Sequence, residues 1–415
     1  MILALVVVTF PIAALCAEST TALEALLWRY VDTPDGREAD ELLDEILRRD
    51  RATVVEITAI FRKGRTYSIQ PTGTHPRVPI AARGRWYSYA LAVPPDYDPA
   101  HPYGLVICLH GAGFTGEAYL ERWESRLGQR YILACPTYTM GAWWTRSAEE
   151  LVLATMRDVV RRYHIDPERI FLTGMSNGGI GAWIIGMHHA DVFAGIAPMA
   201  SGIDDVLFPF LANLKHTPCY VIHGAKDQVM PVRLSQDIVA ELKKLGYEVV
   251  YREHEREHPM AGGHYFPKEE LPDLVAWLDS HRRDSRPTSL ALVRDATHLE
   301  PFDWIRIDAT DRIAAFPESL VESPDHLIKQ RVYAKLLATI GEGNRIDVAA
   351  ALVKRYSLFL NDDLIDVAKP LTVTTNGRTS FEGPLTASVE TLLRQARLRQ
   401  DTHRLYPIHV TVTVR

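Results

Sequence analysis

A serine framed by glycines, directly after an apolar run, constrains this chain more than any other feature. The segment GMSNGG at 174–179 follows RIFLT and precedes the apolar stretch IGAWIIGMHH. A G-x-S-x-G pattern between a strand and a helix predicts a sharp turn, at which Gly174 and Gly178 avoid clashes and the serine hydroxyl is exposed. The N-terminus of the following helix favours negative charge beside that hydroxyl. The pattern therefore predicts that Ser176 is a nucleophile, the alternative being a tight glycine turn with an incidental serine.

Asp227 is the predicted acid partner of this serine. A serine hydroxyl needs a neighbouring base, and after such a turn the partners follow the serine in the order Asp, His. Asp227 ends the segment HGAKD, which comes directly after the apolar run PCYVI. The alternative for Asp227 is to cap the helix predicted over LSQDIVAEL. Asp204 and Asp205, one predicted strand earlier, are the competing acids.

His264 is the predicted general base. It follows Gly262 and Gly263 and precedes YFP, in a loop between a predicted strand and the last helix of this region. Glycines before the histidine allow the backbone to bring the imidazole over the serine. His254 and His258 compete for the role, but they lie in REHEREH, whose alternating charges indicate a solvated strand edge.

Backbone amides near HGAG at 110–113 are the predicted oxyanion donors. This segment follows the apolar run LVICL, and its glycines allow N–H groups to face a developing oxyanion. We expect the amides of Ala112 and Asn177 to be the two donors, with Gly113 as the alternative to Ala112.

Two adjacent tryptophans are candidates for substrate binding. Trp143 and Trp144 follow the apolar run YILACPT, which places them at the same predicted edge of the sheet as the serine. Aromatic side chains at that edge could stack on a sugar or an aryl group. A packed loop anchored by tryptophan is the alternative.

Predicted strands and helices alternate between residues 76 and 283. Runs such as GLVICLHG and RIFLTGM predict buried strands, and AEELVLATMRDVVRRYH predicts an amphipathic helix. This alternation predicts an α/β fold, a doubly wound and mostly parallel sheet with helices on both faces.

The two regions that flank residues 76–283 do not show this alternation of strands and helices. Residues 18–75 have apolar residues at helical spacing and predict an accessory helical segment. Residues 288–415 predict a separate β-rich α+β domain with at least one helix, over ASVETLLRQARLRQ. Asn376 and Gly377 predict a hairpin turn within this domain. The domain's role is not predicted by any of these patterns.

Residues 1–17 are apolar and end in small residues, which predicts a signal peptide and export to the periplasm or the medium. An uncleaved anchor is the alternative, because no Lys or Arg precedes the apolar run. No other stretch is long enough to predict a membrane span. Of the cysteines after the leader, we expect Cys108, Cys135 and Cys219 to be buried free thiols.

Composition and charge bear on the class of partner. The chain is 47% hydrophobic and 24% charged, which is ordinary for a globular protein. Its net charge of −6, without a long block of like charge, gives no indication of a nucleic-acid partner.

Four motifs in this order resemble a known family. HGAG at 110, DPERIFLTGMSNGG at 166, HGAKDQVMP at 223 and GGHYFP at 262 make residues 80–283 similar to the α/β-hydrolase superfamily. The resemblance is to the branch that holds carboxylesterases, polyhydroxybutyrate-depolymerase-like and feruloyl or acetyl esterases, and prolyl-oligopeptidase-type hydrolases. It implies Ser176 as nucleophile, Asp227 as acid and His264 as base, and it covers about half the chain.

The resemblance implies a serine esterase that cleaves a small-molecule or polysaccharide-linked carboxylic ester. A prolyl-oligopeptidase-type peptidase is the first alternative, although such enzymes usually carry a propeller ahead of the hydrolase domain. Only about 75 helix-like residues precede that domain in this chain. An inactive hydrolase scaffold that serves as a binding protein is the second alternative.

We expect this chemistry to need no metal or organic cofactor. The histidines form no H-E-x-x-H pattern, and there is no paired C-x-x-C. His188 and His189 are adjacent on a predicted helix, so we expect them to be surface or packing residues.

Overall fold

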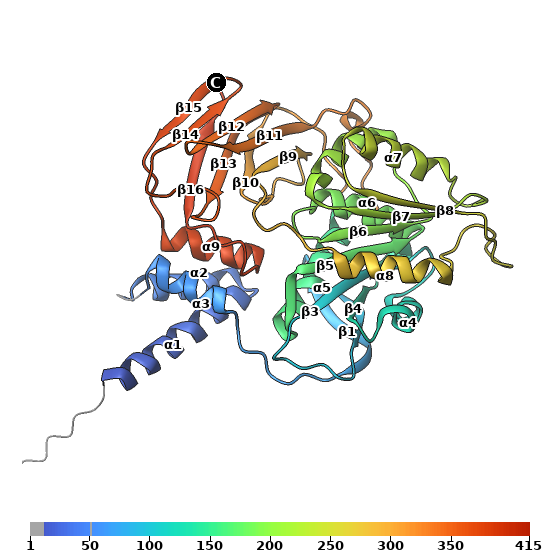
Figure 1. Ribbon diagram of the computed structural model, residues 1–415, viewed down its shortest axis with the longest axis horizontal. Helices are drawn as coiled ribbons and strands as arrows, with labels where there is room; N and C mark the ends of the chain where they lie inside the picture. The colour runs from blue at the N-terminus through green and yellow to red at the C-terminus, as the bar shows by residue number, and fades with distance from the viewer. Residues whose placement is uncertain (1–11, 50–51) are drawn as a thin grey trace, which may run out of the picture. The chain divides into compact units, whose positions relative to one another are not determined.

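The computed structural model describes residues 12–49 and 52–415, with side chains from residue 22 onward. The described chain forms two compact units (Figure 1). One holds the residues before Tyr67 together with Thr386–His409, and the other holds Tyr67–Leu385 and Val410–Arg415. This division differs from the boundaries expected from the sequence, because the helix near residue 390 belongs to the unit of the N-terminal helices and the strands after residue 288 belong to the unit of the large sheet.

In its described residues, the first unit holds four helices around one apolar core. They are α1 (Ile12–Asp32), α2 (Gly36–Leu47), α3 (Val54–Lys63) and α9 (Val389–Arg399). Leu27, Ile46 and Ile57 of the first three helices are fully buried against Leu392 and Leu393 of α9. Helices of 10 to 12 residues, such as α2, α3 and α9, are marginal in isolation, so burial of their apolar faces in the shared core stabilises them. Thr53 and Glu56 also form a reciprocal capping box at the start of α3.

An eight-stranded sheet dominates the second unit, in the order β1-β2-β4-β3-β5-β6-β7-β8. Its strands are β1 (Gly73–Ala82), β2 (Arg85–Val93), β3 (Tyr103–Leu109), β4 (Tyr131–Pro136), β5 (Ile165–Met175), β6 (Gly195–Met199), β7 (Cys219–Gly224) and β8 (Val249–His254). Strands β1 and β2 are antiparallel to their neighbours, and the rest pair in parallel. The predicted, mostly parallel sheet is therefore confirmed, with β1 as an edge strand that the sequence did not predict.

Helices cover both faces of this sheet (Figure 1). They are α4 (Gly116–Leu127), α5 (Arg146–Arg162), α6 (Asn177–His188), α7 (Arg233–Lys244) and α8 (Leu271–Ser280), with short 3-10 helices η1 (Thr139–Gly141), η2 (Asp205–His216) and η3 (Lys268–Glu270). Val106 and Cys108 of β3 share an apolar cluster with α4 and α8. Leu109 points the other way, onto Gly181 of α6. Since neighbouring side chains of a strand face opposite sides, α6 covers the second face.

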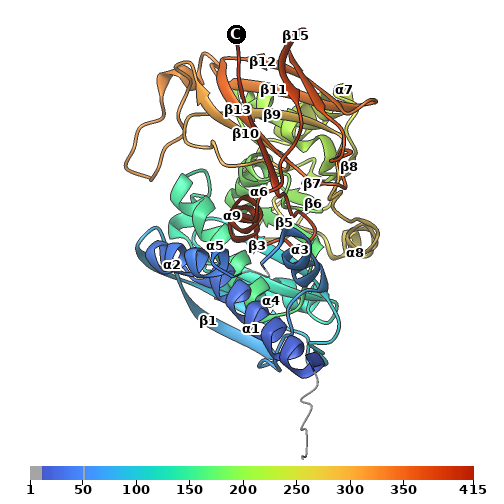
Figure 2. The ribbon, with the colours of Figure 1, turned by 90° about the vertical axis from the view of Figure 1, so that its left-hand side faces the viewer.

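Two smaller sheets complete the second unit (Figure 2). One has the order β15-β14-β12-β11-β9 and the other the order β10-β13-β16. Their elements are β9 (Ser289–Arg294), β10 (Ile305–Thr310), η4 (His326–Ile328), β11 (Ala334–Gly341), β12 (Arg345–Ala351), β13 (Val353–Leu360), β14 (Leu371–Thr375), β15 (Arg378–Gly383) and β16 (Ile408–Thr413).

The predicted hairpin turn is confirmed within the larger of these two sheets. Asn376 and Gly377 join β14 to β15 with φ values of 50° and 79°. Positive φ at both central positions is what a two-residue hairpin turn of the type I′ class requires.

The predicted leader, residues 1–17, lies largely outside the described residues, which begin at residue 12. In the part of the chain that the structure describes, no helix is long and apolar enough to cross a membrane. Cys108, Cys135 and Cys219 are buried free thiols, as expected.

Candidate active site

Ser176 lies on the turn between β5 and α6. Its backbone has φ 59° and ψ −126°, a conformation that costs free energy for any residue other than glycine. Its N–H donates to the Met199 carbonyl at 3.1 Å, and its hydroxyl does not cap the helix. A Cβ atom at Gly174 would collide with the Gly178 carbonyl, and one at Gly178 would collide with the Leu109 carbonyl. The glycines therefore permit the close approach that holds this serine in its strained conformation.

Asp227 and His264 form a hydrogen-bonded pair. His264 Nδ1 donates to Asp227 Oδ2 at 2.7 Å, while Asp227 Oδ1 accepts the N–H groups of Val229 and Met230, each at 2.8 Å. A proton held on Nδ1 leaves Nε2 of His264 free to accept one. The carboxylate therefore orients the imidazole in the tautomer that a general base needs.

Glycines also set the position of His264. A Cβ atom at Gly263 would lie 2.5 Å from the Asp227 backbone nitrogen, and one at Gly224 would collide with the Gly263 carbonyl. Gly262 has φ 55°. The turn before His264 thus packs backbone against backbone on the turn that carries Asp227. Because β5, β7 and β8 end at one edge of the sheet, their C-terminal loops place Ser176, Asp227 and His264 along that edge.

The competing residues have other roles in the structure. Asp204 accepts the Val206 N–H at 3.1 Å and caps η2, and Asp205 pairs with Arg331 at 2.9 Å. His258 Nδ1 accepts the Met260 N–H at 3.2 Å, and His254 Nε2 contacts the Tyr265 carbonyl at 3.3 Å.

His223 was missed by the sequence analysis, although it lies in the same HGAKD segment as Asp227. It is completely buried, with Nε2 2.9 Å from the Met230 carbonyl and 3.3 Å from Asp227 Oδ2. Burial is the main reason that the pKa of His223 is lowered from its ordinary value. The neutral ring therefore supports the turn that carries Asp227.

The segment His110–Gly113 lies directly beside the serine. A Cβ atom at Gly111 would be 3.6 Å from the Ser176 Cβ atom. Gly111 is buried, whereas Ala112 and Gly113 are exposed. Asn177 begins α6, and its side-chain amide donates to the Met140 carbonyl at 3.2 Å. The expected oxyanion donors, the amides of Ala112 and Asn177, therefore belong to the two segments that adjoin Ser176.

His110 holds this segment in place, a role that the sequence analysis did not predict. The ring is completely buried, donates from Nδ1 to the Gly111 carbonyl at 2.8 Å and accepts the Tyr138 N–H at Nε2 at 3.1 Å. Desolvation lowers its pKa below the ordinary value, and the two backbone hydrogen bonds oppose that shift. One donating and one accepting nitrogen are what a neutral imidazole offers.

The two tryptophans have different environments. Trp143 is completely buried and donates from its indole nitrogen to the His110 carbonyl at 2.8 Å, as in the alternative of a packed loop anchored by tryptophan. Trp144 is 37% exposed.

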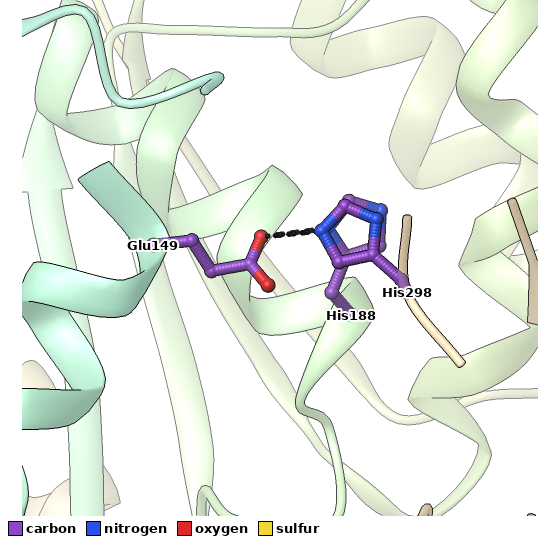
Figure 3. A group of neighbouring side chains, drawn as sticks. All are labelled: Glu149, His188 and His298. Carbon is purple, nitrogen blue, oxygen red and sulfur yellow. Dashed lines mark hydrogen bonds and ion pairs between the residues drawn. The ribbon is translucent and has the colours of Figure 1, made fainter. Parts of the chain in front are cut away.

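A second group of chemically active side chains lies away from Ser176. Glu149, His188 and His298 bring one nitrogen or oxygen atom each to within 4.8 Å of one another (Figure 3). The sequence contains no metal-ligand pattern at these positions, and His188 and His189, expected to be surface or packing residues, are buried and hydrogen-bonded to Glu149. The group was missed because Glu149 and His298 are 149 residues apart.

The sheet order and the serine turn define an α/β-hydrolase fold. No protein-family model matches the chain. The chain is 33% identical over 114 residues to poly(3-hydroxyalkanoate) depolymerase C of Paucimonas lemoignei, which is 24% of this chain and 28% of that protein. It is 31% identical over 120 residues to acyl-protein thioesterase 1 of Gibberella zeae, covering 28% and 48% of the two chains.

Feruloyl esterase C of Emericella nidulans is 27% identical over 176 residues, covering 39% of this chain and 62% of that protein. The matches thus span less than two thirds of each relative. A solved thermostable esterase is 26% identical with a TM-score of 0.42, covering 50% of this chain and 63% of that one. The resemblance to α/β-hydrolase esterases seen in the motifs is confirmed by these relatives.

Proposed function

We propose that this protein hydrolyses carboxylic esters through an acyl-enzyme on Ser176. The observation that carries the proposal is the 2.7 Å hydrogen bond between His264 and Asp227, at the sheet edge where the strained turn presents Ser176. The names of the relatives support this class of reaction, since a depolymerase of a polyester, a thioesterase and a feruloyl esterase all act on acyl groups.

In the proposed mechanism Ser176 Oγ attacks the ester carbonyl while His264 Nε2 takes its proton. The amides of Ala112 and Asn177 stabilise the oxyanion of the tetrahedral intermediate. His264 then gives its proton to the leaving alcohol, and the acyl group stays on the serine. Water, activated by the same imidazole, attacks the acyl-enzyme and releases the acid. Asp227 keeps the imidazole oriented and stabilises its charged form in both steps.

We further propose that the substrate is a small-molecule or polysaccharide-linked ester, that Trp144 contacts it, and that residues 1–17 direct export. The exposed ring of Trp144 supports the second of these points. Mass spectrometry of the N-terminus of protein recovered from the medium or the periplasm would test the leader, and an intact Met1 there would contradict it.

The decisive experiment compares wild type with Ser176→Ala on p-nitrophenyl acetate, butyrate and octanoate. We expect kcat/KM to fall by several orders of magnitude in the variant, because the nucleophile is lost. Ser125→Ala, which changes an exposed serine on α4, is the matched control and should keep full activity.

Covalent labelling separates the remaining alternatives. A fluorophosphonate probe should label wild type at Ser176 and leave Ser176→Ala unlabelled, whatever the natural substrate is. Labelling with turnover of peptide substrates only would replace the esterase by a peptidase. Absence of both labelling and turnover would support an inactive scaffold.

A further inference from the structure

Three segments of the second unit bring Glu149, His188 and His298 together. We call these residues the Glu-His-His cluster. Glu149 lies on α5, His188 at the end of α6, and His298 in the turn after β9. His188 Nδ1 and His298 Nε2 each lie 3.0 Å from the same oxygen, Glu149 Oε2 (Figure 3). The three side chains are only 1–2% exposed.

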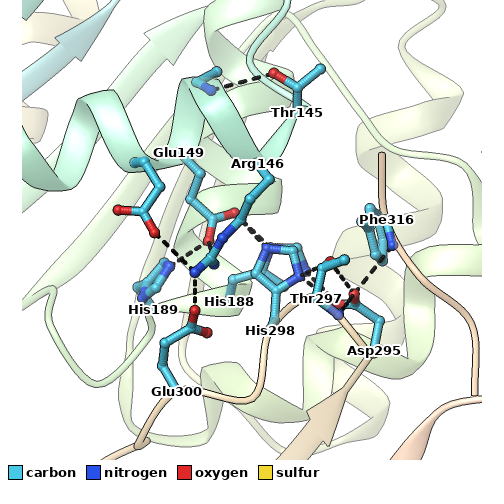
Figure 4. A network of polar contacts seen from close by, with 12 residues as sticks. Thr145, Arg146, Glu149, His188, His189, Asp295, Thr297, His298, Glu300 and Phe316 are labelled. Carbon is cyan, nitrogen blue, oxygen red and sulfur yellow. Dashed lines mark hydrogen bonds and ion pairs between the residues drawn. The ribbon is translucent and has the colours of Figure 1, made fainter. Parts of the chain in front are cut away.

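Further polar groups form hydrogen bonds with the atoms of Glu149 and His298 that do not face the other members of the cluster (Figure 4). His298 Nδ1 donates to Asp295 Oδ2 at 2.5 Å, and Asp295 also accepts the Thr297 and Phe316 N–H groups. Glu149 Oε1 accepts hydrogen bonds from His189 at 2.5 Å and Arg146 at 3.0 Å. Metal-binding histidines and carboxylates in proteins are oriented by partners of this kind on their outer atoms.

We propose that Glu149 Oε2, His188 Nδ1 and His298 Nε2 bind a divalent transition-metal ion, with Zn²⁺ as the best fit. Two imidazole nitrogens and one carboxylate oxygen are an established donor set for zinc. Calcium and magnesium prefer sites made mainly of oxygen atoms, and copper(I) prefers sulfur. The cluster offers neither of those environments.

The charges around the cluster also suit a divalent cation. The carboxylates of Glu149 and Asp295 are buried there and attract cations, and the buried guanidinium group of Arg294 interacts with both of them. Arg146 binds Oε1 rather than Oε2, and its own charge is shared with Glu150 at 2.9 Å and with Glu300. The guanidinium group therefore leaves the oxygen shared by the two histidines open to an ion.

The distances from Glu149 to the two histidines are close to those of a zinc site, but the two rings have to separate. A tetrahedral ion with ligands at about 2.0–2.1 Å holds neighbouring ligand atoms about 3.3 Å apart, close to the 3.0 Å found between Glu149 and each histidine. The His188 and His298 rings stack with centroids 3.8 Å apart, so they must spread to direct both lone pairs at one ion. Binding displaces the protons that these nitrogens otherwise share with Glu149, and a buried water is expected as the fourth ligand.

The proposed ion is structural. The cluster is closed to solvent, and it joins two helices of the large sheet to the turn that follows β9. The N-terminus of α5 is also attached to the β-rich part of this unit, because the Arg146 and Ser147 N–H groups donate to the carbonyls of Pro317 and Glu318. A metal ion here would stabilise that attachment without taking part in acyl transfer.

Metal content is the first test. Protein purified without an affinity tag or chelator and exposed to ZnCl₂ should retain about one zinc ion per chain, measured by inductively coupled plasma mass spectrometry. His298→Gln and His188→Gln should retain almost none. His101→Gln is the matched control, since that side chain is 75% exposed, and it should bind as wild type does.

Thermal unfolding gives an independent readout. We expect EDTA to lower the Tm of wild type by several degrees and added ZnCl₂ to restore it, because an ion that binds only the folded state stabilises it. His298→Gln loses hydrogen bonds and should have a lower Tm that neither EDTA nor zinc changes.

Two results would overturn the proposal. One is wild type that retains no zinc and has the same Tm in EDTA and in ZnCl₂, which would leave a metal-free hydrogen-bonded cluster. The other is equal zinc binding by wild type and both histidine variants. If the variants do not fold, X-ray absorption spectroscopy of zinc-loaded wild type tests the proposal instead. The spectrum should show only nitrogen and oxygen ligands of zinc at about 2.0–2.1 Å, with imidazole among them.

Discussion

Asp227 binds His264 through one carboxylate oxygen and the backbone of its own turn through the other. The Nδ1···Oδ2 distance is 2.7 Å, and Oδ1 accepts two N–H groups at 2.8 Å each. An amide that kept the backbone hydrogen bonds through its oxygen would present its NH₂ group, which can only donate, to His264 Nδ1. The carboxylate therefore defines the tautomer of the imidazole as well as its position.

Asp227→Asn should lower kcat/KM for p-nitrophenyl esters by about 10³–10⁴-fold, because the imidazole loses its preferred tautomer. Steady-state kinetics with the Tm measured in parallel would check this. Asp204→Asn is the control, since Asp204 caps η2, and its kcat/KM should stay close to wild type. Equal losses in both variants would contradict the role given to Asp227.

Gly178→Ala should destabilise the fold and abolish activity together. Its Cβ atom would meet the Leu109 carbonyl, a backbone group that cannot move aside without displacing β3. We expect the free energy of unfolding to fall by about 3 kcal/mol in denaturant titrations. Gly36→Ala, at a site with open space around the new methyl group, should change it by less than about 1 kcal/mol.

Acid should weaken the fold through buried neutral histidines. The pKa values of His110 and His223 are lowered in the folded state, mainly by burial, from an ordinary value of 6.5. Their contribution to stability is complete above the unfolded-state pKa and is lost as the pH falls below it, because only the unfolded chain takes up the protons. The contribution of these two rings to the free energy of unfolding should therefore decrease as the pH is lowered from 7.5 to about 5.5, while His298, with its pKa raised to about 9, contributes in the opposite direction above pH 6.5.

His110→Asn tests the origin of that pH dependence. The variant should be less stable than wild type at neutral pH, but it should lose less stability on acidification, because one titrating group is gone. An unchanged slope of unfolding free energy against pH would assign the effect to other groups.

Substitution of the two tryptophans should have different effects, on stability for Trp143 and on substrate binding for Trp144. Trp143→Ala should lower the free energy of unfolding by about 3–5 kcal/mol, because it empties a fully buried site and removes the hydrogen bond to the His110 carbonyl. Trp144→Ala should leave stability nearly unchanged and raise KM for aryl esters. Chemical denaturation and kinetics on acetyl and feruloyl esters distinguish the two, and a KM unaffected in Trp144→Ala would remove that residue from the substrate site.

Several elements were predictable because their signals are local. The apolar runs of β3, β5 and β7 end at the segments HGAG, GMSNGG and HGAKD, and the structure places all three at one edge of the sheet. Strand β1 was not predictable in the same way. Pro76 and Pro79 and its half-exposed pattern conceal a strand that pairs on one side only.

The sequence by itself determined the chemistry that depends on neighbouring residues. The strained serine turn, the glycines before His264 and the Asn376-Gly377 hairpin each follow from steric limits on a few adjacent residues, which any fold must obey. The order of Ser176, Asp227 and His264 along the chain follows from the order of the strands.

Only the tertiary structure decided which distant groups meet. It buried Trp143 against His110, packed α9 with the N-terminal helices, and brought His298 to Glu149 across 149 residues. The physical reason is that these contacts depend on the burial of whole faces of helices and sheets. The free energy of such burial is a sum over many side chains. A short segment of sequence therefore does not determine which distant segment it packs against.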